Sequence, residues 1–301
     1  MNESTVFSAI APSEKAQDAP ELRFSEESEC AEFLFRLRWP DGFRCPRCGN
    51  GGAYKVATRR LPLYECTRCG HQASLTAGTV MEGSRTPLVK WFYAARCLAQ
   101  NDGITAKALA QKIRVTYKTA WTMLHKLRKA ISEDDRKRKL SGIVRICDGE
   151  YRPYMGCSSS IWRDPREFPV LVGISETADG RPVAVKLKEA AKNPYDRSWT
   201  HKGDVWKFIE DHCEENVRPA EISIGRFRVP ARKKGLLFFR AARQWLRTTF
   251  RGIGRKHRQA YWDEYAYRLN ASFTNACAFA ALLRLCATTG RTTYRKLVSS
   301  V

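Results

Sequence analysis

The stretch that decides the first part of the fold is Cys45-Pro-Arg-Cys48-Gly, which recurs in similar form as Cys66-Thr-Arg-Cys69-Gly. In each copy one tight turn directs two thiols to the same side, and the glycine that follows permits the backbone of the turn. Two such turns supply four thiolates, which is the ligand set of a closed tetrahedral zinc site. Because such a site has no open position, the sequence predicts a structural zinc ion at Cys45, Cys48, Cys66 and Cys69.

The other cysteines, seven of the 11 in the chain, are scattered and suggest no disulfide framework. A thioredoxin-like redox role for Cys-x-x-Cys is the weaker alternative, because two matched pairs are present. The N-terminus lacks the basic start and apolar middle of a signal peptide, and no apolar run reaches the roughly 18–20 residues of a membrane span. We therefore expect a bacterial, cytoplasmic, nucleoid-associated protein with reduced thiols and no membrane partner.

The charge balance points to a polyanionic partner. The chain of 301 residues has 53 Lys and Arg against 31 Asp and Glu, a formal net charge of +22. Residues 222–262 contain no acid and are rich in Lys and Arg. Nucleic acid is the usual partner of such a chain, whereas a solubilising surface or a membrane-attracted patch is the less specific interpretation.

Hydrophobic periodicity divides the chain into a helical first half and an α/β second half. A polar leader is followed by apolar residues at helical spacing, and after residue 140 β-branched runs alternate with Gly, Pro and Asp. We expect helices at 24–39, 87–100, 104–131, 205–215, 235–250, 256–269 and 273–287, and strands at 53–57, 61–64, 142–151, 169–175, 182–187 and 220–225. The charged run 133–139 is expected to be a linker or a frayed helix end.

Residues 103–128 have the layout of a helix-turn-helix. Thr105 precedes a first predicted helix, a short turn follows at 113–115, and a second helix starts near Thr116. The alternative is an ordinary helical hairpin with a wet basic face. In the helix-turn-helix reading, side chains at the start of the second helix face outward and contact DNA. These predicted contacts are Tyr117, Lys118, Thr119 and Thr122.

The order of these motifs resembles the insertion sequence 1595 family of transposases, over about residues 24–301. The resemblance implies an N-terminal zinc ribbon, a helical DNA-binding segment and a ribonuclease-H-like domain with a DDE set of catalytic acids. It rests on Trp39-Pro-Asp-Gly-Phe-Arg-Cys-Pro-Arg-Cys-Gly, Ala77-Gly-Thr-Val, Arg85-Thr-Pro-Leu with Trp91-Phe, Tyr117-Lys-Thr-Ala-Trp, Met123-Leu-His-Lys-Leu-Arg, Asp148, Pro169-Val-Leu-Val-Gly, Gly252-Ile-Gly, Tyr261-Trp-Asp-Glu-Tyr-Ala-Tyr-Arg-Leu-Asn and Tyr294-Arg-Lys-Leu.

The family's chemistry needs three acidic side chains around two Mg²⁺ ions roughly 4 Å apart. Asp148 matches the first, but Gly149 follows it where the family usually has Glu. The second acid is expected near Ile224 and the third within residues 240–245, and neither stretch contains one. Asp179, Asp204 or Asp211 is a less favoured replacement. Mg²⁺ is therefore expected only if the catalytic site is functional.

The basic residues of the acid-free stretch remain candidates for phosphate contacts: Arg232, Lys233, Lys234, Arg240 and Arg243.

The fold class expected is multidomain α/β. The parts are a flexible leader (1–22), a zinc ribbon with a preceding helix (23–80), a helix-turn-helix-like segment (81–138) and a ribonuclease-H-like mixed sheet with flanking helices (139–301). The function expected is that of a DNA-binding transposase acting on an insertion sequence. The alternative is a catalytically inactive, transposase-derived DNA-binding protein or repressor, and a plain zinc transcription factor is weaker. Double-stranded DNA is the expected partner, and the family implies a homo-oligomer.

Overall fold

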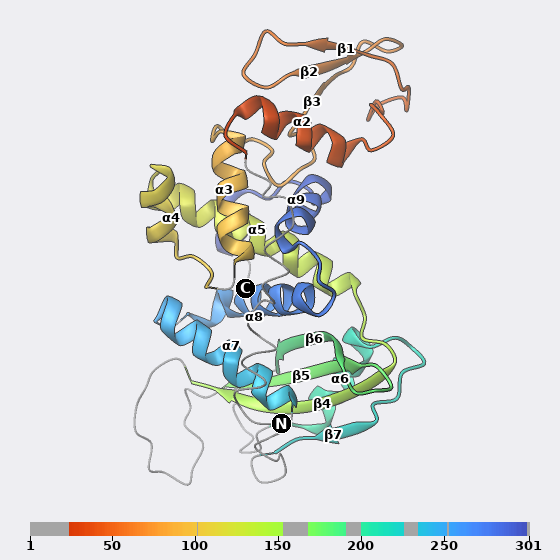
Figure 1. Cartoon of the computed structure of the whole chain (residues 1–301), viewed down its shortest axis with the longest axis vertical. Coiled ribbons are helices and arrows are strands. Elements are labelled where there is room, and N and C mark those ends of the chain that lie inside the picture. The colour runs from red at the N-terminus through yellow and green to blue at the C-terminus, as the bar shows by residue number, and fades with distance from the viewer. Residues whose placement is uncertain are drawn as a thin grey trace. The chain divides into compact units, whose positions relative to one another are not determined.

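The computed structural model describes residues 24–100, 102–152, 168–190, 200–225, 234–251 and 253–299. Contacts divide these residues into two compact units. The sheet unit is Ile131–Ala276, and the ribbon unit is formed by the described residues before and after that range. Both contain helices and strands, which confirms the mixed α/β class (Figure 1). Within the described ranges, no helix is long and apolar enough to cross a membrane.

The ribbon unit combines a small antiparallel sheet, ordered β1-β2-β3, with helices from both ends of the chain. Its elements are α2 (Glu27–Arg38), β1 (Ala53–Val56), β2 (Leu63–Cys66), β3 (Gln72–Ser74), α3 (Leu88–Ala99), α4 (Ala106–Ile113), the first part of α5 (Tyr117–Lys137), α9 (Ala278–Thr288) and α10 (Tyr294–Ser299).

Aromatic side chains form the core beside the small sheet. Neighbouring rings among Phe35, Trp39, Phe43 and Tyr64 have centroids 4.8–5.9 Å apart. Arg38 lies over the Trp39 ring at 4.5 Å, and its guanidinium donates to the carbonyl oxygens of residues 74 and 75. Large rings supply much buried area from few residues, which suits strands of three or four residues.

Helix α9 packs against α2 and α3, although it follows the sheet unit in sequence. Its buried face consists of Leu282, Leu283, Cys286 and Ala287. This helix was expected to belong to the α/β segment 139–301. The contacts instead group it with the ribbon unit, whose helix α3 also buries apolar side chains such as Phe92.

The sheet unit is built on one mixed sheet with the order β6-β5-β4-β7. Strand β5 pairs antiparallel with β4 and with β6, and β7 pairs parallel with β4. Helix α6 lies between β6 and β7 in sequence, as a parallel crossover requires. The elements are β4 (Ile143–Tyr151), β5 (Phe168–Glu176), β6 (Pro182–Glu189), α6 (Lys202–His212), β7 (Glu221–Ser223), α7 (Lys234–Phe250) and α8 (Arg255–Phe273).

Alternation along β4 sends its side chains to two different cores. Val144 and Ile146 pack with Phe208 of α6 on one face. Cys147 and Tyr151 belong to the larger core on the other face, which α7 and α8 cover (Figure 1). Asp148 lies two residues after Ile146 and four after Val144, so its side chain is on the same face of the strand, toward α6.

Long-range ion pairs determine two features of the sheet unit. The run 133–139 was expected to be a linker or a frayed end, but α5 continues to Lys137 because Asp135 pairs with Lys186 and Lys188 of β6. Asp263 of α8 is buried, 2.6 Å from the Lys188 ammonium. Periodicity within one segment does not reveal a partner more than 50 residues away.

The close approach of α7 to β4 depends on glycine. A Cβ atom at Gly149 would overlap the ring of Phe239 on α7. We predict that Gly149→Ala destabilises the sheet unit by ~1–3 kcal/mol, because overpacking a dense core forces strain. The control is Gly203→Ala in α6, where a Cβ atom would meet nothing within 4 Å.

Hydrogen–deuterium exchange of peptides from β4 and β5 measures the effect. Equal protection in the two variants would contradict the overlap.

Candidate metal centre and nucleic-acid interface

The four predicted zinc ligands converge in the ribbon unit. The sulfur atoms of Cys45, Cys48, Cys66 and Cys69 all lie within 4.8 Å of one another. The pairs Cys45–Cys69 and Cys48–Cys66 are 3.7 and 3.6 Å apart. Tetrahedral Zn–S bonds of about 2.3 Å place sulfurs roughly 3.8 Å apart, so this donor set fits a structural zinc ion.

Backbone geometry orients these thiols toward one another. Gly49 and Gly70 have φ values of +72° and +65°, and their N–H groups close each turn onto the carbonyls of Cys45 and Cys66. Burial raises the pKa of the Cys66 thiol. Hydrogen bonds from the backbone N–H groups of Cys69 and Arg68 and from neighbouring thiols outweigh this effect and bring the pKa to about 6.

The α4–turn–α5 segment follows the predicted layout. Thr105 caps α4 by accepting a hydrogen bond from the backbone N–H of residue 108, and Arg114 ends the helix at φ +51°. Thr116 caps α5 through the N–H of Thr119 at 3.2 Å. The two helices bury Leu109, Ile113, Ala120, Leu124 and Leu127, while Val115 and Trp121 are half-buried.

The predicted DNA contacts on α5 differ in their exposure. Tyr117 is 60 % exposed, and the Lys118 ammonium lies 4.6 Å from the centre of the Tyr294 ring. Thr119 and Thr122 are half-buried, and the Thr122 hydroxyl donates to the carbonyl of Lys118. Tyr294 was not among the predicted contact residues, because it lies 176 residues after Lys118 in the chain.

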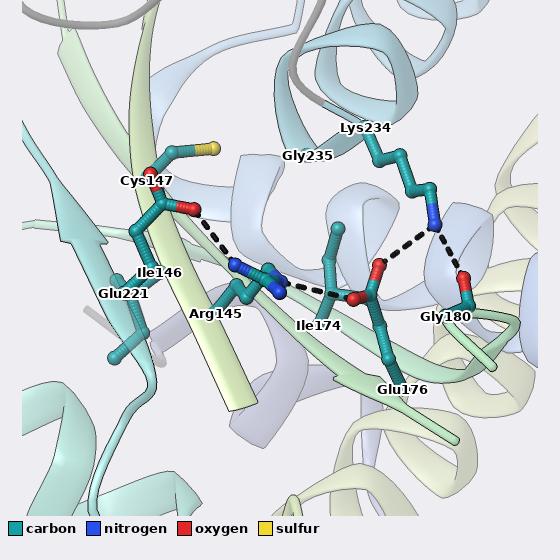
Figure 2. A pocket seen from close by; sticks show the side chains of 9 residues that line it. All are labelled: Arg145, Ile146, Cys147, Ile174, Glu176, Gly180, Glu221, Lys234 and Gly235. Carbon is teal, nitrogen blue, oxygen red and sulfur yellow. Dashed lines mark hydrogen bonds and ion pairs between the residues drawn. The ribbon is translucent and has the colours of Figure 1, made fainter. Parts of the chain in front are cut away.

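On α7, Lys234 lines a cavity of about 350 Å³ in the sheet unit. Its ammonium binds the Glu176 carboxylate at 3.1 Å and the carbonyl of Gly180 (Figure 2). Arg145, in the same cavity, lies between Glu176 and Glu221 at 3.0 and 2.9 Å. Lys234 is therefore committed to an internal carboxylate, which competes with the predicted phosphate contact.

The other predicted contacts on this stretch fall into two groups. Arg240 and Arg243 are half-buried on α7, and the Arg243 guanidinium lies 5.8 Å from the centre of the Phe239 ring. Burial, followed by the charges of Arg247 and Arg240, lowers the pKa of Arg243. Arg232 and Lys233 lie outside the described residues.

Asp148 is buried in the middle of the sheet, with 8 % of its surface exposed. Its carboxylate accepts a hydrogen bond from the Thr200 hydroxyl at 2.6 Å and from the N–H of Gly225 at 3.1 Å. Burial raises the pKa of this carboxyl, and the bonds from Thr200 and Gly225 lower it in part. The residue thus joins β4 to the start of α6 and to the end of β7.

Two of the three carboxylates considered as replacements have other partners. Asp179 forms an ion pair with Arg181 at 2.6 Å, and Asp204 caps α6 through the N–H of His201. Among the residues that the structure describes, the cysteine cluster alone brings three or more metal-ligating side chains together. The described surroundings of Asp148 therefore do not fit a two-Mg²⁺ site.

Loss of one zinc ligand is expected to unfold the ribbon sheet. We predict that Cys69→Ser loses bound zinc and the exchange protection of β1–β3, because structural zinc supplies folding free energy. Cys277→Ser, at an exposed cysteine outside the cluster, is the control and retains one zinc per chain. Metal analysis and hydrogen exchange provide the readouts, and a ribbon that stays protected without metal would refute the structural role.

The folded protein holds the proton of the Asp148 carboxyl more tightly than the unfolded chain does, because its pKa is raised above the ordinary value of 3.8. The protonated carboxyl therefore contributes fully to the stability of the folded state below pH 3.8. This contribution is lost as the pH rises through the folded-state pKa. We predict that Asp148→Asn is at least as stable as wild type at pH 7, with the difference shrinking toward pH 3. Urea unfolding across this range is the measurement, and a less stable variant at pH 7 would contradict it.

Comparison with known proteins supports the expected family. Residues 25–72 match the family described as the transposase zinc-ribbon domain of the insertion sequence 1595 type. The chain is 30 % identical over 132 residues to an uncharacterised protein in transposable element ISH50 of Halobacterium salinarum, covering 42 % of either chain. The chain thus matches less than half the length of that relative, and no solved structure matches it. The resemblance to the insertion sequence 1595 family of transposases is thus confirmed over residues 25–72, which match the family's zinc ribbon.

Proposed function

We propose that this chain binds double-stranded DNA as a transposase-type protein and serves the transposition of an insertion sequence. The observation that carries the proposal is the four-thiolate ribbon, which matches a transposase zinc-ribbon domain. The relative's place in a transposable element points the same way. The net charge of +22 favours a polyanionic partner.

The DNA-binding parts we propose are the ribbon (23–80) and the helical segment (81–138). Helix α4, the turn at Arg114 and the exposed start of α5 support a helix-turn-helix in which Tyr117 and Lys118 reach DNA. Phosphate contacts dominate affinity in such proteins, so binding is expected to depend steeply on salt. A homo-oligomer is part of the proposal, since the family acts on paired DNA ends.

Of the segment 139–301, we propose that the part within the sheet unit, up to Ala276, is ribonuclease-H-like. The strand order β6-β5-β4-β7, with β7 parallel and β5 antiparallel to β4, supports this assignment. A buried Asp in the middle of the first strand supports it as well. The family's reaction is metal-dependent strand cleavage and transfer.

A second candidate is a catalytically silent, transposase-derived DNA-binding protein or repressor. The environment of Asp148 favours it, because both described neighbours of the carboxylate, Thr200 and the N–H of Gly225, are hydrogen-bond donors. The family's Glu after this Asp is replaced by Gly149, and Phe239 fills the space beside it. For the chemical step we favour this candidate.

The experiment combines binding and cleavage on one preparation. We predict that wild type and Asp148→Asn bind a labelled duplex equally, with affinity falling about 10³-fold or more between 50 and 200 mM salt. We predict no nicking of supercoiled plasmid with Mg²⁺ or Mn²⁺. The assay is repeated on DNA containing the element's own ends.

The outcomes separate the candidates. Metal-dependent nicking that Asp148→Asn abolishes would establish an active transposase whose remaining acids lie outside the described residues. Absence of DNA binding at low salt would overturn the proposed function as a whole.

A further inference from the structure

A cavity of about 370 Å³ lies beside the first turns of α5 in the ribbon unit. Three separate parts of the chain form it: residues 82–91, helix α5 with Lys118 and Lys126, and the segment from Arg291 to Tyr294, the first residue of α10. The C-terminal segment was not among the predicted DNA contacts.

The cavity is lined by more positive than negative charge. Lys118, Lys126 and Arg291 contribute three cations, and Glu82 contributes one carboxylate. Glu82 lies 3.3 Å from the Arg291 guanidinium, so it offsets only part of this charge. The hydroxyls of Thr119 and Thr122 add neutral hydrogen-bonding groups to the wall.

Lys126 is the most constrained of the three cations. Its side chain is 8 % exposed, and its ammonium donates to the carbonyl of Val80 at 3.2 Å. Burial and then the nearby charge of Arg291 lower its pKa, which Glu82 raises in part. Two neighbouring cations, one of them buried, are stabilised when an anion enters between them.

The C-terminal segment is fixed against α5 by specific contacts. The Lys129 ammonium donates to the hydroxyl of Thr292 at 2.8 Å, and Thr292 is buried. The rings of Trp121 and Tyr294 meet edge to face at 5.8 Å, and Lys118 lies over the Tyr294 ring. The position of Arg291 beside the predicted recognition helix is thus determined by packing.

We propose that this cavity binds a phosphate of the DNA backbone, and that the segment Arg291–Tyr294 is part of the DNA-binding surface. The proposal rests on the proposed function and deepens it. A phosphodiester presents anionic oxygens that an Arg fork and a Lys ammonium bind together. The cavity lies next to Lys118, so a duplex contacted by the start of α5 reaches it.

The test is the salt dependence of duplex binding, measured by fluorescence anisotropy with a labelled 30-base-pair duplex over a KCl series. The variants are Arg291→Gln and Lys118→Gln. The matched control is Arg284→Gln, an exposed cation on α9 that does not line the cavity. The Arg291 side chain is 55 % exposed, so its removal leaves the core intact, and far-UV circular dichroism checks this.

We expect Arg291→Gln to weaken binding about 3- to 10-fold and to reduce the slope of log K against log[KCl] by about 0.9, as for one lost phosphate contact. Both cations bind the same phosphate in this proposal. The double variant Arg291→Gln with Lys118→Gln is therefore expected to reduce the slope by about 0.9 in total, and not by twice that amount. Arg284→Gln is expected to keep the wild-type slope.

Two outcomes overturn the proposal. If wild type binds and Arg291→Gln keeps the slope of Arg284→Gln, the cavity is not a phosphate site while the proposed function stands. If wild type does not bind the duplex at 50 mM KCl, both fall together.

Discussion

A carboxylate buried in the middle of a sheet constrains everything around it. Asp148 must be met by donors, since an unpaired buried charge costs several kcal/mol. Thr200 and the N–H of Gly225 meet it, and they lie at the start of α6 and after β7. The Asp148 side chain therefore connects β4 to Thr200 before α6 and to Gly225 after β7. The local arrangement of the sheet unit depends on this interaction, whether or not a metal ever joins it.

The opposite face of β4 is set by a steric constraint. A Cβ atom at Gly149 would overlap the Phe239 ring, and a Cβ atom at Gly235 would overlap the Cys147 sulfur. Helix α7 consequently lies close to the sheet, and its cations divide between internal partners and solvent. Lys234 is drawn to Glu176, and Arg243 is half-buried beside Phe239. A run of basic residues in sequence is therefore a weaker guide to phosphate contacts than their positions on the folded helix.

How much of this could be predicted from the sequence depends on the range of each interaction. The zinc ligands, the cap at Thr105 and the strands around Asp148 follow from residues close in sequence, and the structure agrees with them. The extension of α5 and the burial of Asp263 depend on Lys188, which no local pattern indicates. Helix α9 has a plain apolar face, and its sequence contains nothing to say which helices it covers. The cavity beside α5 was missed for the same reason.

The division of the contacts into two units bears on the proposed loss of the catalytic acids. Clustered carboxylates repel one another and cost stability, so their replacement removes a strained group and leaves the apolar core intact. The core around Val172, Trp262 and Phe239 includes Ala242 and Trp245, which lie in the stretch where the family's third acid is expected, so apolar side chains occupy that stretch. DNA binding in our proposal relies on the ribbon unit, whose zinc cluster and aromatic core involve different residues. In this proposal DNA binding places no demand on the catalytic acids, and only strand cleavage would preserve them.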